Sequence, residues 1–337
     1  MVTYSNIEPK ESLNYYSAVA RNILIFSELE NVLLAFKKAE IPVIVLKGAA
    51  LAATIYPDIS CREMGDVDLL VRPEERELAR DILELEGYYF IPESEKGLSP
   101  FDSAFTGEMA FRKGDGALFE LHWELTPVEW LRQVIALDNE ALWDDALPIK
   151  INSMQVLQLS PCDMLLHLCI HLTAHNYAHP VGFRDIVQLL KFHTPFPWDA
   201  FVDRAIAFRL RTLCYFPLFT ACLDLGANVP QAVLDALRPS SFLCKLISWI
   251  ANPKKGLTGE LKNVKPRGYL VHLIVADQQS DALQVFFWLL FPGSRWLAER
   301  YRLKGLWRPW LACFWHPFFV LWQGFLGLRE VAAGRAG

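Results

Sequence analysis

Apolar residues in the first part of the chain recur with two periods, one typical of helices and one typical of buried strands. Residues 11–39 contain no glycine or proline and predict an amphipathic helix. Its apolar positions lie three or four residues apart, at Ile23, Phe26, Leu29, Leu33 and Phe36. Short apolar runs at 41–46 and 67–71 predict buried strands. Short helices are expected to follow them, over 49–56 and 73–87.

The pattern then changes to hairpins and afterwards to helices. A Gly-Asp-Gly turn separates two strand-like arms within 107–125, and 148–159 resembles a second hairpin. Ser160 is a suitable N-cap before a proline, so a helix is expected from there through His175. Further helical patterns cover 181–193, 198–224, 230–237, 241–251 and 268–291.

Length, charge and cysteine usage narrow the class of protein. A chain of 337 residues suits two domains of roughly 100 to 200 residues each, and the change of pattern places their boundary near residue 150. The formal net charge of -5 argues against bulk binding of nucleic acid. The seven cysteines form no C-x-x-C pair, and the N-terminal residues lack a secretory signal. We therefore expect a cytoplasmic protein.

One segment near the C-terminus does not fit this picture. Pro309–Leu328 carries no charged side chain over about the length of a bilayer span, but prolines and glycines interrupt it. A buried or partner-covered helix, an interfacial membrane helix and a true span are the alternatives. We expect 306–328 to form a helical hairpin, or a broken helix kinked near Pro317, docked partly on the second domain. Its exposed aromatic face is predicted to bind the anionic inner face of the membrane reversibly.

A pair of aspartates opens the second predicted strand. Alternate side chains of a strand share a face, so Asp66 and Asp68 project together while Val67 points into the core. Two like charges so close need a cation, and Mg2+ (or Mn2+) suits carboxylate oxygens. A solvent-facing strand end whose acids only aid solubility is the alternative.

Further residues favour the metal-site interpretation. Gly48 follows the first strand, where its backbone would approach a phosphate, and the next helix would offer free N–H groups. Lys47 and Arg62 bracket the acids and are expected to neutralise triphosphate charge. Glu120 lies within an arm of the first hairpin, from which an adjacent strand would bring it beside the aspartates. His122, on the same face as Glu120, either reaches the metal site or packs beneath it.

These motifs give the chain a family resemblance. The stretch LKGAALAATIYPDISCREMGDVDLLV, residues 46–71, and ELHWEL, residues 120–125, resemble the uncharacterised nucleotidyltransferase family of bacteria, within the DNA polymerase beta superfamily. Ala49 stands where the superfamily usually has Gly or Ser, and the gap from glycine to aspartate is longer than usual. The resemblance implies three metal ligands and a phosphate-side element, namely Asp66, Asp68 and Glu120, with Lys47 and Gly48.

The resemblance also implies a fold and a reaction. The expected fold is α+β, with a polymerase beta-like domain on a small mixed sheet over 1–150 and a mainly helical domain over 151–337. The expected reaction is magnesium-assisted transfer of a nucleoside monophosphate from a nucleoside triphosphate to an acceptor. The acceptor is left open between a protein side chain, a sugar phosphate and a small metabolite.

The helical half contributes a row of histidines. His167, His171 and His175 lie four residues apart and therefore on one face of a helix. A structural role, a position of His171 lining the nucleotide site, and a metal site are the three interpretations.

Two other classes of function share these motifs. A nucleotide-sensing or scaffold protein would keep the fold without turnover; Glu120 argues against this alternative, whereas Ala49 mildly favours it. A peripheral membrane component of a lipid or polysaccharide pathway is compatible with catalysis and depends on the aromatic C-terminal segment.

Overall fold

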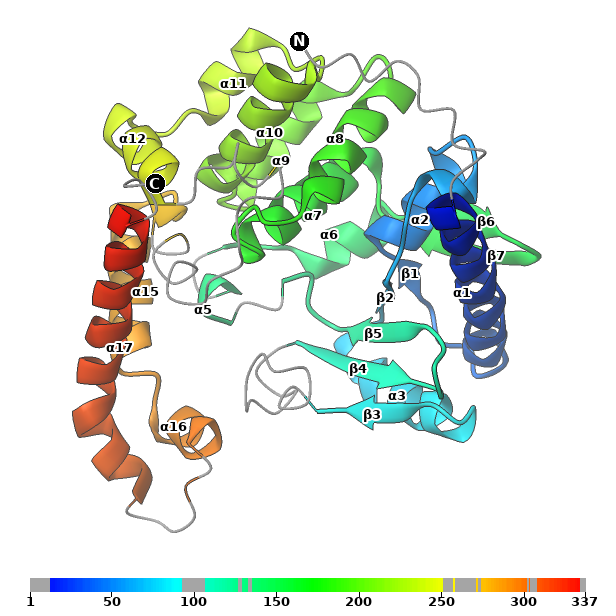
Figure 1. The fold of residues 1–337 in the computed structure, drawn as a ribbon, viewed down its shortest axis with the longest axis horizontal. Helices are drawn as coiled ribbons and strands as arrows, with labels where there is room; N and C mark the ends of the chain where they lie inside the picture. The colour runs from blue at the N-terminus through cyan, green and yellow to red at the C-terminus, as the bar shows by residue number, and fades with distance from the viewer. Residues whose placement is uncertain are drawn as a thin grey trace. The chain divides into compact units, whose positions relative to one another are not determined.

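A seven-stranded mixed sheet forms the first of two units in the computed structural model of the chain (Figure 1). The structure describes residues 13–92, 107–126, 129–132, 135–250, 257, 271, 274–301, 303 and 308–333. The first unit takes in the chain up to Ile91, together with Glu108–Trp123 and Ala146–Leu159. The second, helical unit takes in Pro92–Gly107, Glu124–Asp145 and the chain from Ser160 onward. The predicted α+β fold is confirmed, and the hairpin around residue 150 belongs to the first unit.

The sheet has the strand order β3-β4-β5-β2-β1-β7-β6. Two neighbouring pairs, β2 with β5 and β1 with β7, run parallel, and the other pairs are antiparallel. The strands are β1 Ile44–Val45, β2 Asp66–Leu70, β3 Tyr89–Ile91, β4 Glu108–Arg112, β5 Leu118–His122, β6 Leu147–Ile151 and β7 Met154–Gln158. Both predicted hairpins are present, as β4–β5 and β6–β7, while β3 was not predicted.

Helices accompany the sheet within the first unit. They are α1 Leu13–Lys38, α2 Lys47–Thr54, the short 3-10 turns η2 Ile59–Cys61 and η3 Pro73–Glu75, and α3 Arg76–Leu85. The predicted helix is confirmed as α1, in which Phe26, Leu29, Leu33 and Phe36 are less than 5% exposed, but Ile23, expected on the same apolar side, is 53% exposed. As expected, a proline opens the turn before α3, and Gly87, at a φ of 87°, follows the helix.

Alternation along β2 and β5 separates a core face from a polar face. Val67 and Leu69 pair with Phe119 and Leu121, and all four side chains are fully buried. Burying each of them contributes roughly 1.5 to 3 kcal/mol, so this face fixes the register of the two strands. The opposite face carries Asp66, Asp68, Glu120 and His122.

Two predicted boundaries in the first unit are wrong. The strand expected over 41–46 has only the two residues of β1, and the helix expected from Ala49 begins at Lys47. The reason is Leu46, which has extended backbone angles and caps α2, while its N–H donates to the Asp68 carbonyl at 3.0 Å. The chain therefore enters the helix directly from the strand, and Lys47 and Gly48 lie in the first helical turn.

The second unit is helical in its described residues. Its helices are α5 Glu129–Arg132, α6 Asn139–Asp144, α7 Pro161–Ala174, α8 Pro180–Phe192, α9 Trp198–Ala207, α10 Arg211–Leu225, α11 Gln231–Leu237, α12 Ser241–Ile250, α15 Gln279–Leu290, α16 Ser294–Arg300 and α17 Arg308–Ala333. The predicted cap of α7 is confirmed, because the Ser160 hydroxyl accepts from the Asp163 N–H. Fully buried Leu165, Phe183 and Phe201 lie in the core of this unit.

Two of the long helices predicted in this unit are shorter. The pattern over 198–224 is divided into α9 and α10, where Arg209 adopts a left-handed φ of 57°. The helix expected over 268–291 is interrupted: Val271 and Ile274 are helical, residues 275–278 are not, and α15 begins at Gln279. Asp277, just before it, instead accepts from the N–H groups of Arg211 and Thr212 and so caps α10.

The C-terminal segment forms one helix, α17, so the expected hairpin or broken helix is wrong (Figure 1). Pro317 lies inside this helix, and residues 304–307 lie outside the described residues. The helix packs on α16 through Trp296, Leu297 and Ala312, and within the described residues no helix combines the length and apolarity needed to cross a membrane. An exposed apolar face, as predicted, is made by Trp310, Leu311, Phe314, Trp315, Phe318, Leu321, Trp322, Phe325 and Leu328.

Candidate active site

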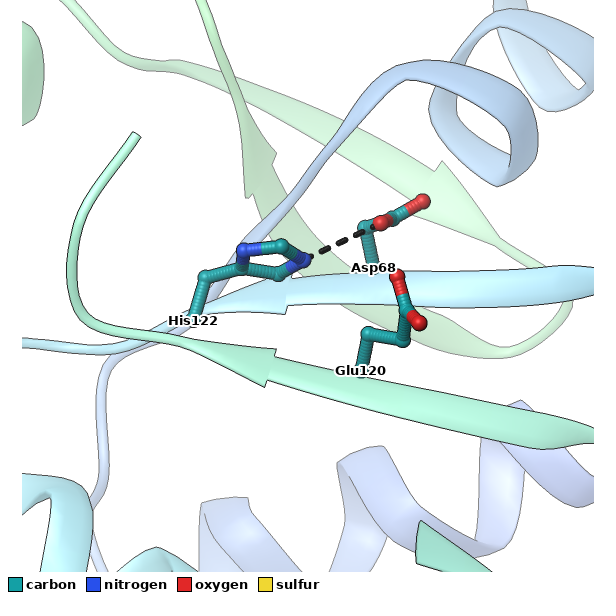
Figure 2. A group of neighbouring side chains, drawn as sticks. All are labelled: Asp68, Glu120 and His122. Atoms are coloured by element: carbon teal, nitrogen blue, oxygen red, sulfur yellow. Dashed lines mark hydrogen bonds and ion pairs between the residues drawn. The ribbon is translucent and has the colours of Figure 1, made fainter. Parts of the chain in front are cut away.

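Two parallel strands bring a carboxylate, a second carboxylate and an imidazole together on the polar face of the sheet. The register pairs Asp68 with Glu120, and His122 follows two residues later on the same face of β5. Figure 2 shows the three side chains pointing toward one another from β2 and β5. One ligand atom from each lies within 4.8 Å of the others, the only such group among the described residues.

Lys47 places its ammonium group against this cluster. Its Nζ lies 2.9 Å from Asp68 Oδ1, and the two side chains are 9% and 2% exposed. The backbone at Lys47 has a φ of 23°, a positive value that residues with a side chain rarely adopt. Such a conformation costs on the order of 1 to 3 kcal/mol and is concentrated at functional sites. The turn from β1 into α2 therefore holds the Lys47 ammonium group against Asp68 on the polar face of the sheet.

His122 links the cluster to a further acid that the sequence analysis did not identify. Its Nε2 lies 3.1 Å from Asp68 Oδ1, and its Nδ1 lies 3.4 Å from Glu108 Oε2 on β4. Glu108 is directly opposite His122 in the antiparallel pair of β4 and β5. The signal was available in the alternation of the hairpin, since cross-strand neighbours on one face must meet.

The predicted phosphate-side residues also lie together. A Cβ atom added to Gly48 would lie 3.6 Å from the Arg62 guanidinium, so no protein atom forces a glycine here. The Leu46 side chain makes no cap hydrogen bond to the N–H groups in the first turn of α2. The loop that carries Arg62 is held by buried Asn22, whose Nδ2 donates to the carbonyls of Ile59 (2.5 Å) and Arg62 (2.8 Å). Asn22 is a second positioning residue that sequence reasoning missed.

This constellation agrees with a comparison of the sequence with known families. The family described as "Uncharacterised nucleotidyltransferase" matches residues 9–223, which include both hairpins and helices α7 to α9. The chain belongs to this family. A crystal structure of an antigenic nucleotidyltransferase-like protein from Paracoccidioides brasiliensis also matches, with 18% identity, 65% of this chain and 95% of that chain covered, and a TM-score of 0.37. No curated protein matched the chain.

In this nucleotidyltransferase family member, the two aspartates of β2 differ in how readily they ionise. Burial raises the pKa of Asp66 to about 6, and the neighbouring Asp68 carboxylate adds to the rise. Burial would also raise the pKa of Asp68, but Lys47 and His122 hold it below its usual range. Burial opposes the charge on Lys47, yet the surrounding carboxylates raise its pKa. One aspartate is thus fully ionised and the other resists ionisation.

The structure therefore brings most of the predicted site residues together in the first unit. Asp68, Glu120 and His122 lie together with Lys47 beside them, and Gly48 and Arg62 are adjacent to each other. Asp66 lies half-buried on the same face but outside the three-residue group, and its role as a ligand stays a prediction. His171 belongs to the second unit, in which it lies beside His175 and His179.

Proposed function

We propose that the protein transfers a nucleoside monophosphate from a nucleoside triphosphate to an acceptor and requires Mg2+ or Mn2+. The observation that carries this proposal is the convergence of Asp68, Glu120 and His122 within 4.8 Å, beside a buried lysine. A strand end whose acids served only solubility would expose them, whereas Asp68 is 2% exposed. Burying carboxylates side by side costs free energy unless opposite charge compensates them, and a bound cation would add such charge to that of Lys47.

The donor set suits a divalent cation. Asp68 and Glu120 offer the carboxylate oxygens that Mg2+ and Mn2+ prefer, and the nitrogen of a neutral His122 ring would favour Mn2+ over Mg2+. The pKa of Asp66, raised to about 6, indicates that an additional positive charge would be accommodated there, and we assign Asp66 as a further carboxylate ligand. When bound, the cation would lower the pKa of the acceptor hydroxyl and stabilise charge on the transferred phosphoryl group.

The remaining residues are assigned to the nucleotide. Gly48 and the first-turn N–H groups of α2 hold phosphate oxygens, and the Arg62 guanidinium beside them neutralises charge on the leaving pyrophosphate. Lys47, whose Nζ is paired with Asp68 at 2.9 Å, is assigned to the same phosphates once a cation neutralises Asp68. Lys47→Ala should therefore weaken binding of a nucleoside triphosphate more than binding of a monophosphate. Equal losses for both nucleotides would assign Lys47 to structure alone.

The test of the proposed function is a transfer assay. The full chain is incubated with labelled nucleoside triphosphates, Mn2+ or Mg2+, and cell extract, which offers protein, sugar phosphate and small-metabolite acceptors together. Label is expected on an acceptor with the unaltered chain and with the surface control Glu84→Gln, and it should be lost with Glu120→Gln. Transfer that survives Glu120→Gln contradicts the assignment. Nucleotide binding without transfer would favour the non-catalytic sensing or scaffold alternative.

We also propose that α17 contacts the anionic inner face of a membrane peripherally. Support comes from its exposed aromatic face and from Arg329, which is exposed near the C-terminal end of the same helix. Phe318, 74% exposed, is the probe: Phe318→Glu should reduce co-sedimentation with anionic vesicles at low salt. Phe192→Glu, at an exposed position on α8, is the matched control and should leave it unchanged. Equal sedimentation of both variants and the unaltered chain would rule this contact out.

A further inference from the structure

A second group of potential metal ligands lies within the helical unit, formed by His171, His175 and His179. The ring centroids are 4.4 Å apart for His171 and His175, 4.3 Å for His175 and His179, and 5.7 Å for His171 and His179. All three side chains are half-buried, so they are accessible to a solvated ion. His179 is the member that helical periodicity alone cannot supply, because α7 ends at Ala174.

A sharply turned connection brings His179 back over α7. Asn176 and Tyr177 adopt left-handed φ values of 53° and 61°, the second being a conformation that bulky residues avoid. Tyr177 is fully buried, and its N–H donates to the Leu172 carbonyl at 2.7 Å. The Ala178 N–H then donates to the His175 carbonyl at 3.0 Å. Two consecutive residues of this kind cost on the order of 1 to 3 kcal/mol each, and such strain marks a position that the surrounding fold enforces.

Helix α8 packs unusually close to α7. A Cβ atom added to Gly182 in α8 would lie only 2.9 Å from a methyl carbon of Leu172 in α7. His179 is the residue that caps α8, and the Gly182 N–H donates to its carbonyl at 3.1 Å. The close approach of α8 to α7 therefore places the His179 ring against the rings of His171 and His175.

From this geometry we infer that His171, His175 and His179 bind a divalent transition-metal ion, of which Zn2+ is the representative. Three imidazoles on a tetrahedral ion, with Zn–N bonds of about 2.0 to 2.1 Å, have ring centres roughly 5 Å apart, and the three separations here bracket that value. In the structure the ring nitrogens of these three histidines do not all lie within 4.8 Å of one another, so metal binding requires rotation of the half-buried rings. A set of imidazoles selects transition metals over Mg2+, which distinguishes it from the carboxylate-rich site of the first unit.

The inference is tested by zinc binding to the full chain, in equilibrium dialysis with excess Mg2+ present. The unaltered chain and Glu120→Gln should both bind one equivalent of zinc. His175→Asn and His179→Asn should lose this equivalent or bind it at least about 10-fold more weakly. His193→Asn, at the C-terminal end of α8, is the matched control and should bind zinc like the unaltered chain. Because Glu120→Gln removes a ligand of the other site, this result does not depend on nucleotidyl transfer.

Cobalt substitution gives an independent readout. Co2+ bound by three imidazoles should produce a visible absorption band in the unaltered chain and in His193→Asn, and no band in His179→Asn. Circular dichroism establishes that each variant is folded before it is compared. Equal zinc binding by the unaltered chain and both cluster variants, or zinc that is lost only with Glu120→Gln, overturns the inference.

Discussion

Replacing Lys47 by methionine removes the buried positive charge that faces Asp68 and leaves a carboxylate that is 2% exposed. Loss of one partner from a buried ion pair costs about 3 to 5 kcal/mol, because the other charge stays buried without compensation. In a unit of this size each kcal/mol lowers the thermal midpoint by roughly 2 to 4 °C. We therefore expect Lys47→Met to lower the midpoint by roughly 6 to 20 °C. Lys38→Met, at the exposed end of α1, should change the stability by less than about 0.5 kcal/mol.

His122 makes this loss dependent on pH. Burial opposes its protonation, but Asp68 and Glu108 raise the pKa of His122 above its usual value. A group with a raised folded pKa contributes stability below the unfolded value, about 6.5, and that contribution is lost as pH rises through the folded pKa. Protonated His122 would partly neutralise Asp68 in the variant. The destabilisation of Lys47→Met should consequently be smaller at about pH 6 than at about pH 9.

Two comparisons separate this electrostatic account from simple loss of packing. The double variant Lys47→Met/Asp68→Asn carries no unpaired charge and should recover most of the stability lost by the single variant. Added Mn2+ should raise the midpoint of Lys47→Met more than that of the unaltered chain, because the cation replaces the missing charge. Thermal denaturation followed by circular dichroism measures both effects. A double variant no more stable than Lys47→Met would refute the reasoning.

Three further predictions concern other buried groups. Asn22→Ala leaves two buried carbonyls without their donor, so it should destabilise the first unit by about 1 to 3 kcal/mol and raise the KM for nucleoside triphosphate through displacement of Arg62. Burial lowers the pKa of His316 below 6.5, so neutral His316 contributes stability above that pH and the contribution is lost as pH falls through the folded pKa. His316→Gln should abolish this dependence in thermal scans from about pH 7.5 to about pH 5.5. Gly182→Ala should cost about 1 to 3 kcal/mol in chemical denaturation, and Leu172→Ala in the same chain should reduce that cost.

The elements that could be predicted from sequence are those whose signals are local. The period of α1, the turn of the β4–β5 hairpin and the N-cap of α7 depend on residues close in sequence, and all three are confirmed. The elements that were missed depend on distant partners. β3 is a strand because β4 pairs with it, and the interruption near Asp277 exists because that side chain caps α10. Hydrophobic pattern alone carries no record of such contacts.

In the candidate site, too, the features with local signals were predicted and those that depend on distant partners were not. Alternation put Asp66 and Asp68 on one face, and the hairpin offered Glu120 and His122 on another strand. Which carboxylate meets which partner depends on the register of β2 against β5, and no local pattern encodes this register. The register pairs Asp68 with Glu120, and it therefore makes Asp68 the centre of the cluster.

The position of Lys47 depends on where β1 ends and α2 begins, which the sequence pattern did not predict. Had the strand continued through Leu46, as its apolar character suggested, Lys47 would stand at a strand exit beyond the reach of a buried carboxylate. The short β1 and the immediate start of α2 instead bring its ammonium group within 2.9 Å of Asp68. An ammonium held there cannot also contact a distal phosphate. The ammonium group of Lys47 can therefore either pair with Asp68 or contact phosphate, but not both at once. A divalent cation that neutralised Asp68 would free Lys47 to contact phosphate.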